Sequence, residues 1–132
     1  MEEKLEELSA RCRAHIRNGQ IAQYAADLKE IAGLFGQEKQ LRNQLKMLFL
    51  AFYIDLSGLG RAPYIDRAVA ERICAAAVGA EMKRDELERF FFEVIPSDMV
   101  AQHPFSVRDC WYLANLCLDD KADQADYILT KV

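Results

Sequence analysis

Thiols and imidazoles are the residue types in this chain best suited to metal binding or nucleophilic catalysis. Cys12 and His15 lie three residues apart and Cys110 and Cys117 lie seven apart, so each pair could share one face of a helix. Zinc accepts such ligands, but tight Cys-x-x-Cys pairs are absent and His103 has no thiol or acid at motif spacing. We therefore expect no metal site, and we expect the cysteines to be mostly buried, unbridged thiols: Cys12, Cys74, Cys110 and Cys117.

Carboxylates offer a second chemistry. Asp55 and Asp66 flank the glycine-containing break at residues 57–63. Acids that are distant in sequence can converge in a fold, so a small metal-dependent or hydrolytic enzyme using these two residues is an alternative interpretation. The C-terminal aspartates lack the spacing of a calcium loop and predict a solvated helix face. They are Asp119, Asp120, Asp123 and Asp126.

No nucleophile motif and no cofactor fingerprint are present. The stretch Gly58-Leu59-Gly60-Arg61 follows an expected helix rather than a strand, so we interpret it as a helix connection and not as a phosphate-binding loop. We assign no catalytic, cofactor-binding or metal-binding residue, and the sequence favours a non-enzymatic protein.

Three adjacent aromatic residues give the main indication of an interaction surface. Phe90, Phe91 and Phe92 occupy consecutive positions of an expected helix. Successive helix positions point about 100° apart, so at least one of the three rings is hard to bury in the same core. We expect at least one ring to be largely exposed in the single chain, or covered by a second copy, and to mark a surface for an unknown protein partner.

The spacing of apolar residues predicts an all-α fold. Apolar positions recur every three or four residues through most of the chain, and the segment 47–54 is apolar on every face, which is typical of an enclosed helix. We expect one domain over residues 1–132, a compact bundle of about seven helices around a buried central helix at about 37–56. The expected helices span about 2–17, 20–34, 37–56, 64–78, 84–95 and 106–118, with the last beginning near 121.

Composition and charge bear on the partners and the location that we expect for this protein. The chain is 52% apolar and 29% charged, with a net charge of −4 that arises entirely in residues 67–132. An acidic surface repels phosphate backbones, so we expect no nucleic-acid partner. The longest apolar run, 47–54, is too short to cross a bilayer, and the acidic start lacks the pattern of an export signal. We expect a cytoplasmic protein without cofactor.

Residues 45–91 contain an ordered series of helix boundaries. An apolar helix ends at Leu56-Ser57-Gly58, a loop follows, and a second helix opens at Ile65-Asp66 and closes at Val78-Gly79. Residues 85–90 (DELERF) then begin the next helix. This arrangement resembles the TerB-like domains, which are associated with tellurite resistance and related stress systems. The resemblance implies an all-helical, non-enzymatic module of about this size, with a role in stress-associated protein interaction.

The chain departs from the TerB-like pattern at its acidic positions. The family usually has Ala-Asp-Gly before the loop, where this chain has Ser57 in place of the aspartate. The family also has a glutamate a little way into the next helix, where this chain has an apolar residue near Ala68 or Val69. No ion-binding residue is therefore carried over from the family.

Overall fold

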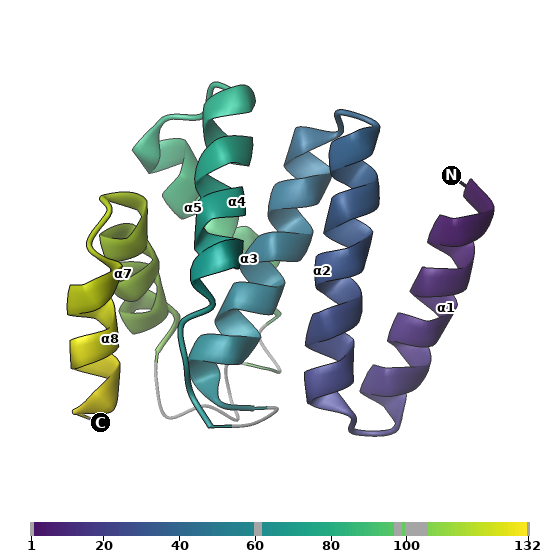
Figure 1. Cartoon of the computed structure of the whole chain (residues 1–132), viewed down its shortest axis with the longest axis horizontal. Coiled ribbons are helices and arrows are strands. Elements are labelled where there is room, and N and C mark those ends of the chain that lie inside the picture. Colours follow the sequence, from purple (N-terminus) through teal and green to yellow (C-terminus); the bar gives the residue numbers. More distant parts are fainter. Residues whose placement is uncertain (1, 60–61, 97–98, 100–105, 132) are drawn as a thin grey trace.

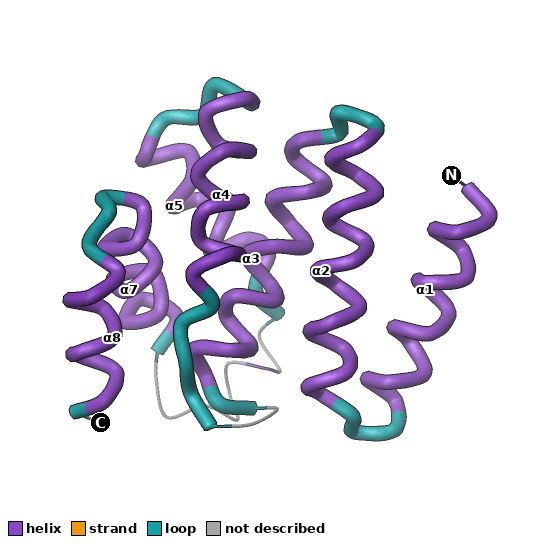
Figure 2. The backbone as a smooth tube through the Cα atoms, viewed as in Figure 1, coloured by secondary structure: helices purple, strands orange, loops and turns teal. Residues whose placement is uncertain are grey.

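A computed structural model describes residues 2–59, 62–96, 99 and 106–131 of the chain. The described part consists of helices and their connections, and it contains no strand (Figure 2). The prediction of an all-α fold is therefore confirmed. Seven helices of the described part are α1 (Glu2–Arg17), α2 (Ile21–Gln37), α3 (Leu41–Ser57), α4 (Arg67–Gly79), α5 (Arg84–Val94), α7 (Val107–Leu118) and α8 (Ala122–Thr130).

The helices follow one another across the longest axis of the molecule, with α1 at one end and α8 at the other (Figure 1). α1 packs against α2, and α2 packs along α3. α3 also contacts α4, α5 and α7, and α8 packs against α7. None of the described helices has the length and apolar character needed to cross a membrane.

α3 is the central helix, as its sequence predicts. Every residue from Leu48 to Ser57 is buried, and Leu48 and Phe52 are respectively 0% and 1% exposed. Neighbouring helices enclose this second half of α3 because it is apolar on almost every side, whereas Arg42, Asn43 and Lys46 of the first half are exposed. Gly79 allows a close approach at one of these contacts, since a Cβ there would lie 3.0 Å from Leu41 Cδ1.

Four helices end in the same hydrogen-bonding pattern. In each case a residue with positive φ donates its N–H to the carbonyl of the residue three positions before it. The residue that follows donates its N–H to the carbonyl five positions before itself, and the two bonds together form a Schellman motif. The motif ends α1, α2, α4 and α7. The residues with positive φ are Gly19, Lys39, Glu81 and Asp120.

The motif at Lys39 explains why the predicted boundary between α2 and α3 is wrong. α2 continues to Gln37 rather than ending near residue 34, and α3 begins at Leu41 rather than at about 37. Lys39 breaks the chain between them with a φ of 57°. A lysine carries little signal for this conformation, so the sequence placed the boundary at the preceding glycine.

Candidate functional site

Phe91 lies in the core and cannot belong to an interaction surface. It is 0% exposed, and its ring centroid is 5.3 Å from that of Phe49 in α3 and 5.5 Å from that of Trp111 in α7. α5 packs against both α3 and α7, so more than one of its faces is covered. The predicted surface is therefore wrong at this position.

Phe90 and Phe92 are only partly buried, and each has an arginine beside its ring. The guanidinium of Arg42 lies 5.1 Å from the ring centroid of Phe90, and that of Arg108 lies 6.0 Å from that of Phe92. The expectation that one ring is largely exposed is wrong for the single chain, because both rings are partly buried and an arginine, from α3 for Phe90 and from α7 for Phe92, lies over each. A contact of Phe90 or Phe92 with a partner stays a prediction.

The cysteines are unbridged thiols, as predicted. Cys12, Cys110 and Cys117 are buried, and Cys74 is partly exposed. Burial raises the pKa of Cys12 and Cys117 to about 11 and that of Cys110 to about 12. These three thiols are therefore protonated at neutral pH, which makes them poor nucleophiles and poor metal ligands. Within the described ranges, no three His, Cys, Asp or Glu side chains gather closely enough to hold a metal ion.

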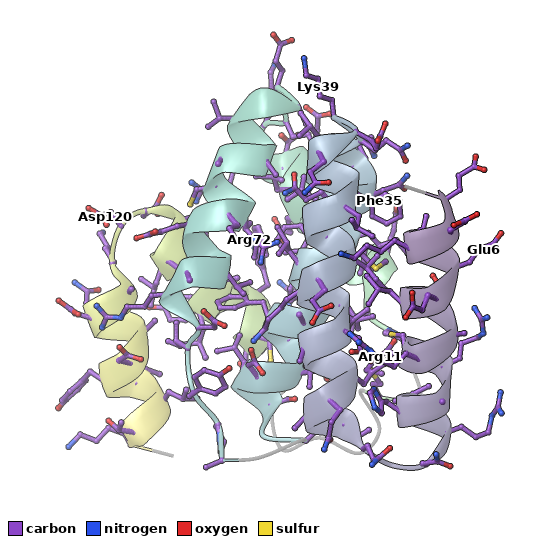
Figure 3. All side chains as sticks on the ribbon, turned by 45° about the vertical axis from the view of Figure 1, so that its right-hand side comes forward. Glu6, Arg11, Phe35, Lys39, Arg72 and Asp120 are labelled. Carbon is purple, nitrogen blue, oxygen red and sulfur yellow. The ribbon has the colours of Figure 1, made fainter. Side chains whose placement is uncertain are left out.

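His15 does not pair with Cys12 but with Asp27 of α2. Its Nδ1 lies 2.5 Å from Asp27 Oδ2, while Arg11 Nε donates to Asp27 Oδ1 over 2.9 Å. Arg11 also reaches Glu30 at 2.9 Å, and it lies between α1 and α2 in Figure 3. This network therefore joins α1 to α2.

Asp55 and Asp66 do converge, and a lysine lies between them. Lys29 Nζ of α2 lies 3.0 Å from Asp55 Oδ2 and 2.8 Å from Asp66 Oδ2, and it donates to the Tyr64 hydroxyl over 3.3 Å. Asp55 is buried, while Lys29 and Asp66 are each about one-fifth exposed at the side chain. The loop thus brings together the two acids that flank it.

Local structure fixes each member of this cluster. Asp55 lies in the last turn of α3, and its carbonyl accepts the Tyr64 N–H over 3.1 Å. Asp66 is the N-cap of α4, where its side chain accepts the Val69 N–H over 3.1 Å. Arg72 of α4 donates to the Lys29 carbonyl over 3.0 Å, and Figure 3 shows its side chain between α4 and α2.

The electrostatics of the two acids differ. Burial raises the pKa of Asp55, and the bonds from Lys29 and Tyr64 only partly offset this. Burial also acts on Asp66, but the bonds from Lys29 and from the Val69 backbone outweigh it, so the pKa of Asp66 is lowered. For Lys29, the hydrogen bonds to the acids outweigh desolvation and raise its pKa, so the lysine stays charged.

A small cavity adjoins this cluster. It has a volume of about 120 Å³ and lies between α2, the end of α3 and the loop that precedes α4. Three alanines of α2 and one isoleucine form its apolar wall, and three polar side chains form the rest. The lining residues are Ala22, Ala25, Ala26, Lys29, Ile54, Asp55 and Tyr64.

A larger apolar groove runs along the other side of α2, where α1, α2 and α3 meet. It has a volume of about 320 Å³. Each of α1 and α2 contributes a stripe of four residues at helical spacing, and Met47 of α3 adds to it. The stripes are Leu5, Ser9, Cys12 and Ile16 from α1 and Tyr24, Leu28, Ile31 and Phe35 from α2; Arg13 is the charged residue of the lining.

The C-terminal acids do not form the purely solvated face that was predicted. Arg67 of α4 lies 2.6 Å from Asp123 and also pairs with Asp126. Arg84 of α5 lies 3.0 Å from Asp119. These aspartates remain accessible, but they also join α7 and α8 to the preceding helices.

Sequence reasoning missed Lys29, Tyr64 and Asp27. A usable signal existed in α2, because Asp27 lies on the same helix face as Ile31 and Leu34, and Lys29 lies on that of Ala25 and Ala32. A charged residue on an apolar face must find a partner when it is buried, so both positions indicated ion pairs. The partners on other helices could not be read from spacing alone.

Comparisons of the chain with family models, with curated proteins and with solved structures find no match. The resemblance of residues 45–91 to TerB-like domains therefore stays a prediction.

Proposed function

We propose that this chain is a non-enzymatic helical module that acts by contact, and that the groove formed by α1, α2 and α3 binds an amphipathic helix of a protein partner. The observation that carries this proposal is the pair of apolar stripes that face each other across the groove. Partly buried side chains line it, among them Leu5, Tyr24, Phe35 and Met47.

The dimensions of the stripes favour a helix as the occupant. Leu5 to Ile16 and Tyr24 to Phe35 each span eleven helical steps, or about 16 Å. A helix that lies in such a groove presents side chains at positions i, i+4, i+7 and i+11, which is the repeat of the stripes themselves. An extended segment would leave its backbone N–H and C=O groups unpaired against this apolar surface.

The charges at the groove favour a partner helix with an acidic flank. Arg13 lines the groove and would face such a flank. Figure 3 shows Glu6 pointing away from α2, so this acid of α1 does not oppose it. Charge pairs at the edge of an interface contribute more to partner choice and orientation than to affinity.

The enzyme alternative has less support. Asp55 and Asp66 both pair with Lys29, so neither carboxylate is poised as a free base. The resemblance to TerB-like domains supports a stress-associated interaction and adds no catalytic residue. We therefore propose that the interaction made by this module has a stress-associated role.

The test uses two synthetic 14-residue helical peptides with leucine at positions 1, 5, 8 and 12, one with a glutamate flank and one with a lysine flank. Fluorescence anisotropy of the labelled peptides should show tighter binding of the glutamate peptide. Phe35→Ser should weaken binding at least tenfold, and Arg13→Glu should reverse the preference between the peptides. Tyr127→Ser, which removes an exposed aromatic ring from α8, is the matched control and should change nothing.

Two results would overturn the proposal. The first is binding that is absent, or that Phe35→Ser and Tyr127→Ser affect equally. The second is self-association in sedimentation that Phe35→Ser abolishes, because the groove would then be filled by a second copy of this chain.

A further inference from the structure

We propose that Cys74 and Cys117 form a dithiol site for a trivalent arsenical, an arsenic(III) compound that carries two hydroxyl groups and one small apolar substituent. Cys74 belongs to α4 and Cys117 to the last turn of α7, and both line one pocket with a volume of about 290 Å³. The pocket lies between α4, the end of α7 and the start of α8, so it is separate from the groove of α1, α2 and α3.

The two thiols lie near each other because α4 packs against α7. Burial and Asp126 raise the pKa of Cys117, and Cys74 adds to this shift, so the two thiols are within electrostatic reach of each other. Cys74 is partly exposed and Cys117 is 8% exposed, which lets a ligand meet Cys74 first and Cys117 inside the pocket. Cys12 and Cys110 do not line this pocket. The pair can therefore hold one atom by two bonds.

The protonation of the pair selects against an ordinary metal cation. Burial is the main cause of the raised pKa of both Cys74 and Cys117, so both thiols carry a proton at neutral pH. A divalent cation binds thiolates and must release these protons to solvent. Within the ranges that the structure describes, no third metal-ligating side chain joins the pair. An arsenic(III) hydroxide needs only two thiols and removes each thiol proton as water, so the raised pKa does not oppose its binding.

The binding reaction is a condensation without electron transfer. In each of two steps, a thiol sulfur forms a bond to arsenic and one arsenic–oxygen bond breaks. The thiol proton leaves with the departing hydroxide as water. The product carries two arsenic–sulfur bonds, two waters are released, and arsenic stays trivalent, so neither an oxidant nor a reductant is needed.

The lining of the pocket favours an apolar substituent on arsenic. Small or apolar side chains lie beside the thiols: Ala70, Leu118 and Ala122. The charged residues of the lining are exposed: Arg67, Glu71 and Asp120. A volume of about 290 Å³ is that of about ten water molecules in the liquid, which is enough for an arsenic atom with a phenyl group. The apolar side chains give that group a surface to pack against.

The test incubates the full, reduced chain with phenylarsine oxide, which water converts to the dihydroxide, and detects adducts by native mass spectrometry. We expect one adduct per chain, heavier than the free chain by one phenylarsine oxide less one water, a mass that requires two arsenic–sulfur bonds. Excess glutathione, a monothiol, should leave this adduct in place, whereas 2,3-dimercaptopropanol should remove it. The adduct should also raise the melting temperature, because the folded pocket holds the two thiols together.

Cysteine variants identify the pair. Cys74→Ala and Cys117→Ala each leave one thiol in the pocket, which should weaken binding about a hundredfold and abolish the glutathione-resistant adduct. Cys74→Ala changes a partly exposed position, so the test holds even if Cys117→Ala does not fold. Cys12→Ala removes a buried thiol outside the pocket as the matched control and should form the adduct like the unmodified chain.

Three results would overturn the proposal. The first is the absence of an adduct that resists glutathione. The second is such an adduct in Cys74→Ala, because another pair of thiols would then bind the arsenical. The third is an adduct that lowers the melting temperature, since the arsenical would then bind the unfolded chain in preference to the folded pocket.

Discussion

Replacing Lys39 with glycine should stabilise the fold, although it removes a side chain. Lys39 has a φ of 57° in the turn after α2, where it is exposed. A non-glycine residue pays about 1–2 kcal/mol for the left-handed conformation. The glycine variant has a more flexible unfolded chain, and this lowers its free energy of unfolding by about 0.4–1 kcal/mol. The difference predicts that Lys39→Gly raises the free energy of unfolding by about 0.5–1 kcal/mol.

Urea titration monitored by circular dichroism measures this change in the free energy of unfolding. The melting temperature should rise by about 2–5 °C. Lys39→Ala is the control, because it removes the same side chain but keeps the Cβ that makes the conformation costly. It should leave stability within about 0.5 kcal/mol of the unmodified chain. Gly19→Ala, at the equivalent turn after α1, should do the reverse of Lys39→Gly and destabilise the fold by about 1 kcal/mol.

The comparison among the three variants can refute the reasoning. If Lys39→Gly and Lys39→Ala have the same stability, the Cβ does not strain this turn. If Lys39→Gly is less stable than the unmodified chain, the flexibility of the unfolded state outweighs the relief of strain. Glu81 and Asp120 adopt the same conformation and offer a repeat of the experiment at two further turns.

Three further predictions concern the core and the thiols. Leu48→Ala should lower the free energy of unfolding by about 2–5 kcal/mol because it opens a cavity beside α3. Asp123→Ala, at an exposed acid, should change it by no more than about 0.5 kcal/mol. The reverse order in a denaturant titration would mean that the core is not around Leu48. Ellman's reagent should modify Cys74 before the buried cysteines, and a fast phase that persists in Cys74→Ser would contradict this. Stability should fall as pH rises above about 9, the ordinary pKa of a thiol, since the unfolded thiols ionise there while burial holds the pKa of Cys110 at about 12. Unfolding curves measured at pH 8 and 10.5 test this prediction. The free energy of unfolding of Cys110→Ala should fall less steeply between these two pH values.

The sequence predicted the elements whose signals are local. The helix at 2–17 has its predicted bounds because apolar spacing marks its body and Gly19 marks its end. The helix that begins after Ser106 is also where the sequence placed it, since Ser106 and Asp109 form the expected capping box. The burial of Leu48 and Phe52 followed from a segment that is apolar on every face.

The sequence failed where the outcome depends on a partner that is distant in the chain. Periodicity within α5 could not reveal that Arg42 and Arg108 cover Phe90 and Phe92, because both arginines come from other helices. Asp55 and Asp66 were singled out from their positions beside one loop, but Lys29 lies 26 residues before Asp55 and changes their chemistry. It converts two candidate catalytic acids into members of an ion-pair network.

α2 contributes to both the proposed groove and the cavity beside Lys29, and its geometry keeps the two apart. Asp27 and Lys29 are two positions apart and point about 200° from each other, so one pairs with α1 and the other with α3 and the N-cap of α4. The stripe that contains Leu28 and Ile31 faces the groove, while Ala25 faces the cavity. The cavity and a helix bound in the groove therefore lie against different faces of one helix. The two ion-pair networks, whose acids Asp27 and Asp55 are buried, hold α2 on both sides and oppose its displacement when a helix binds in the groove.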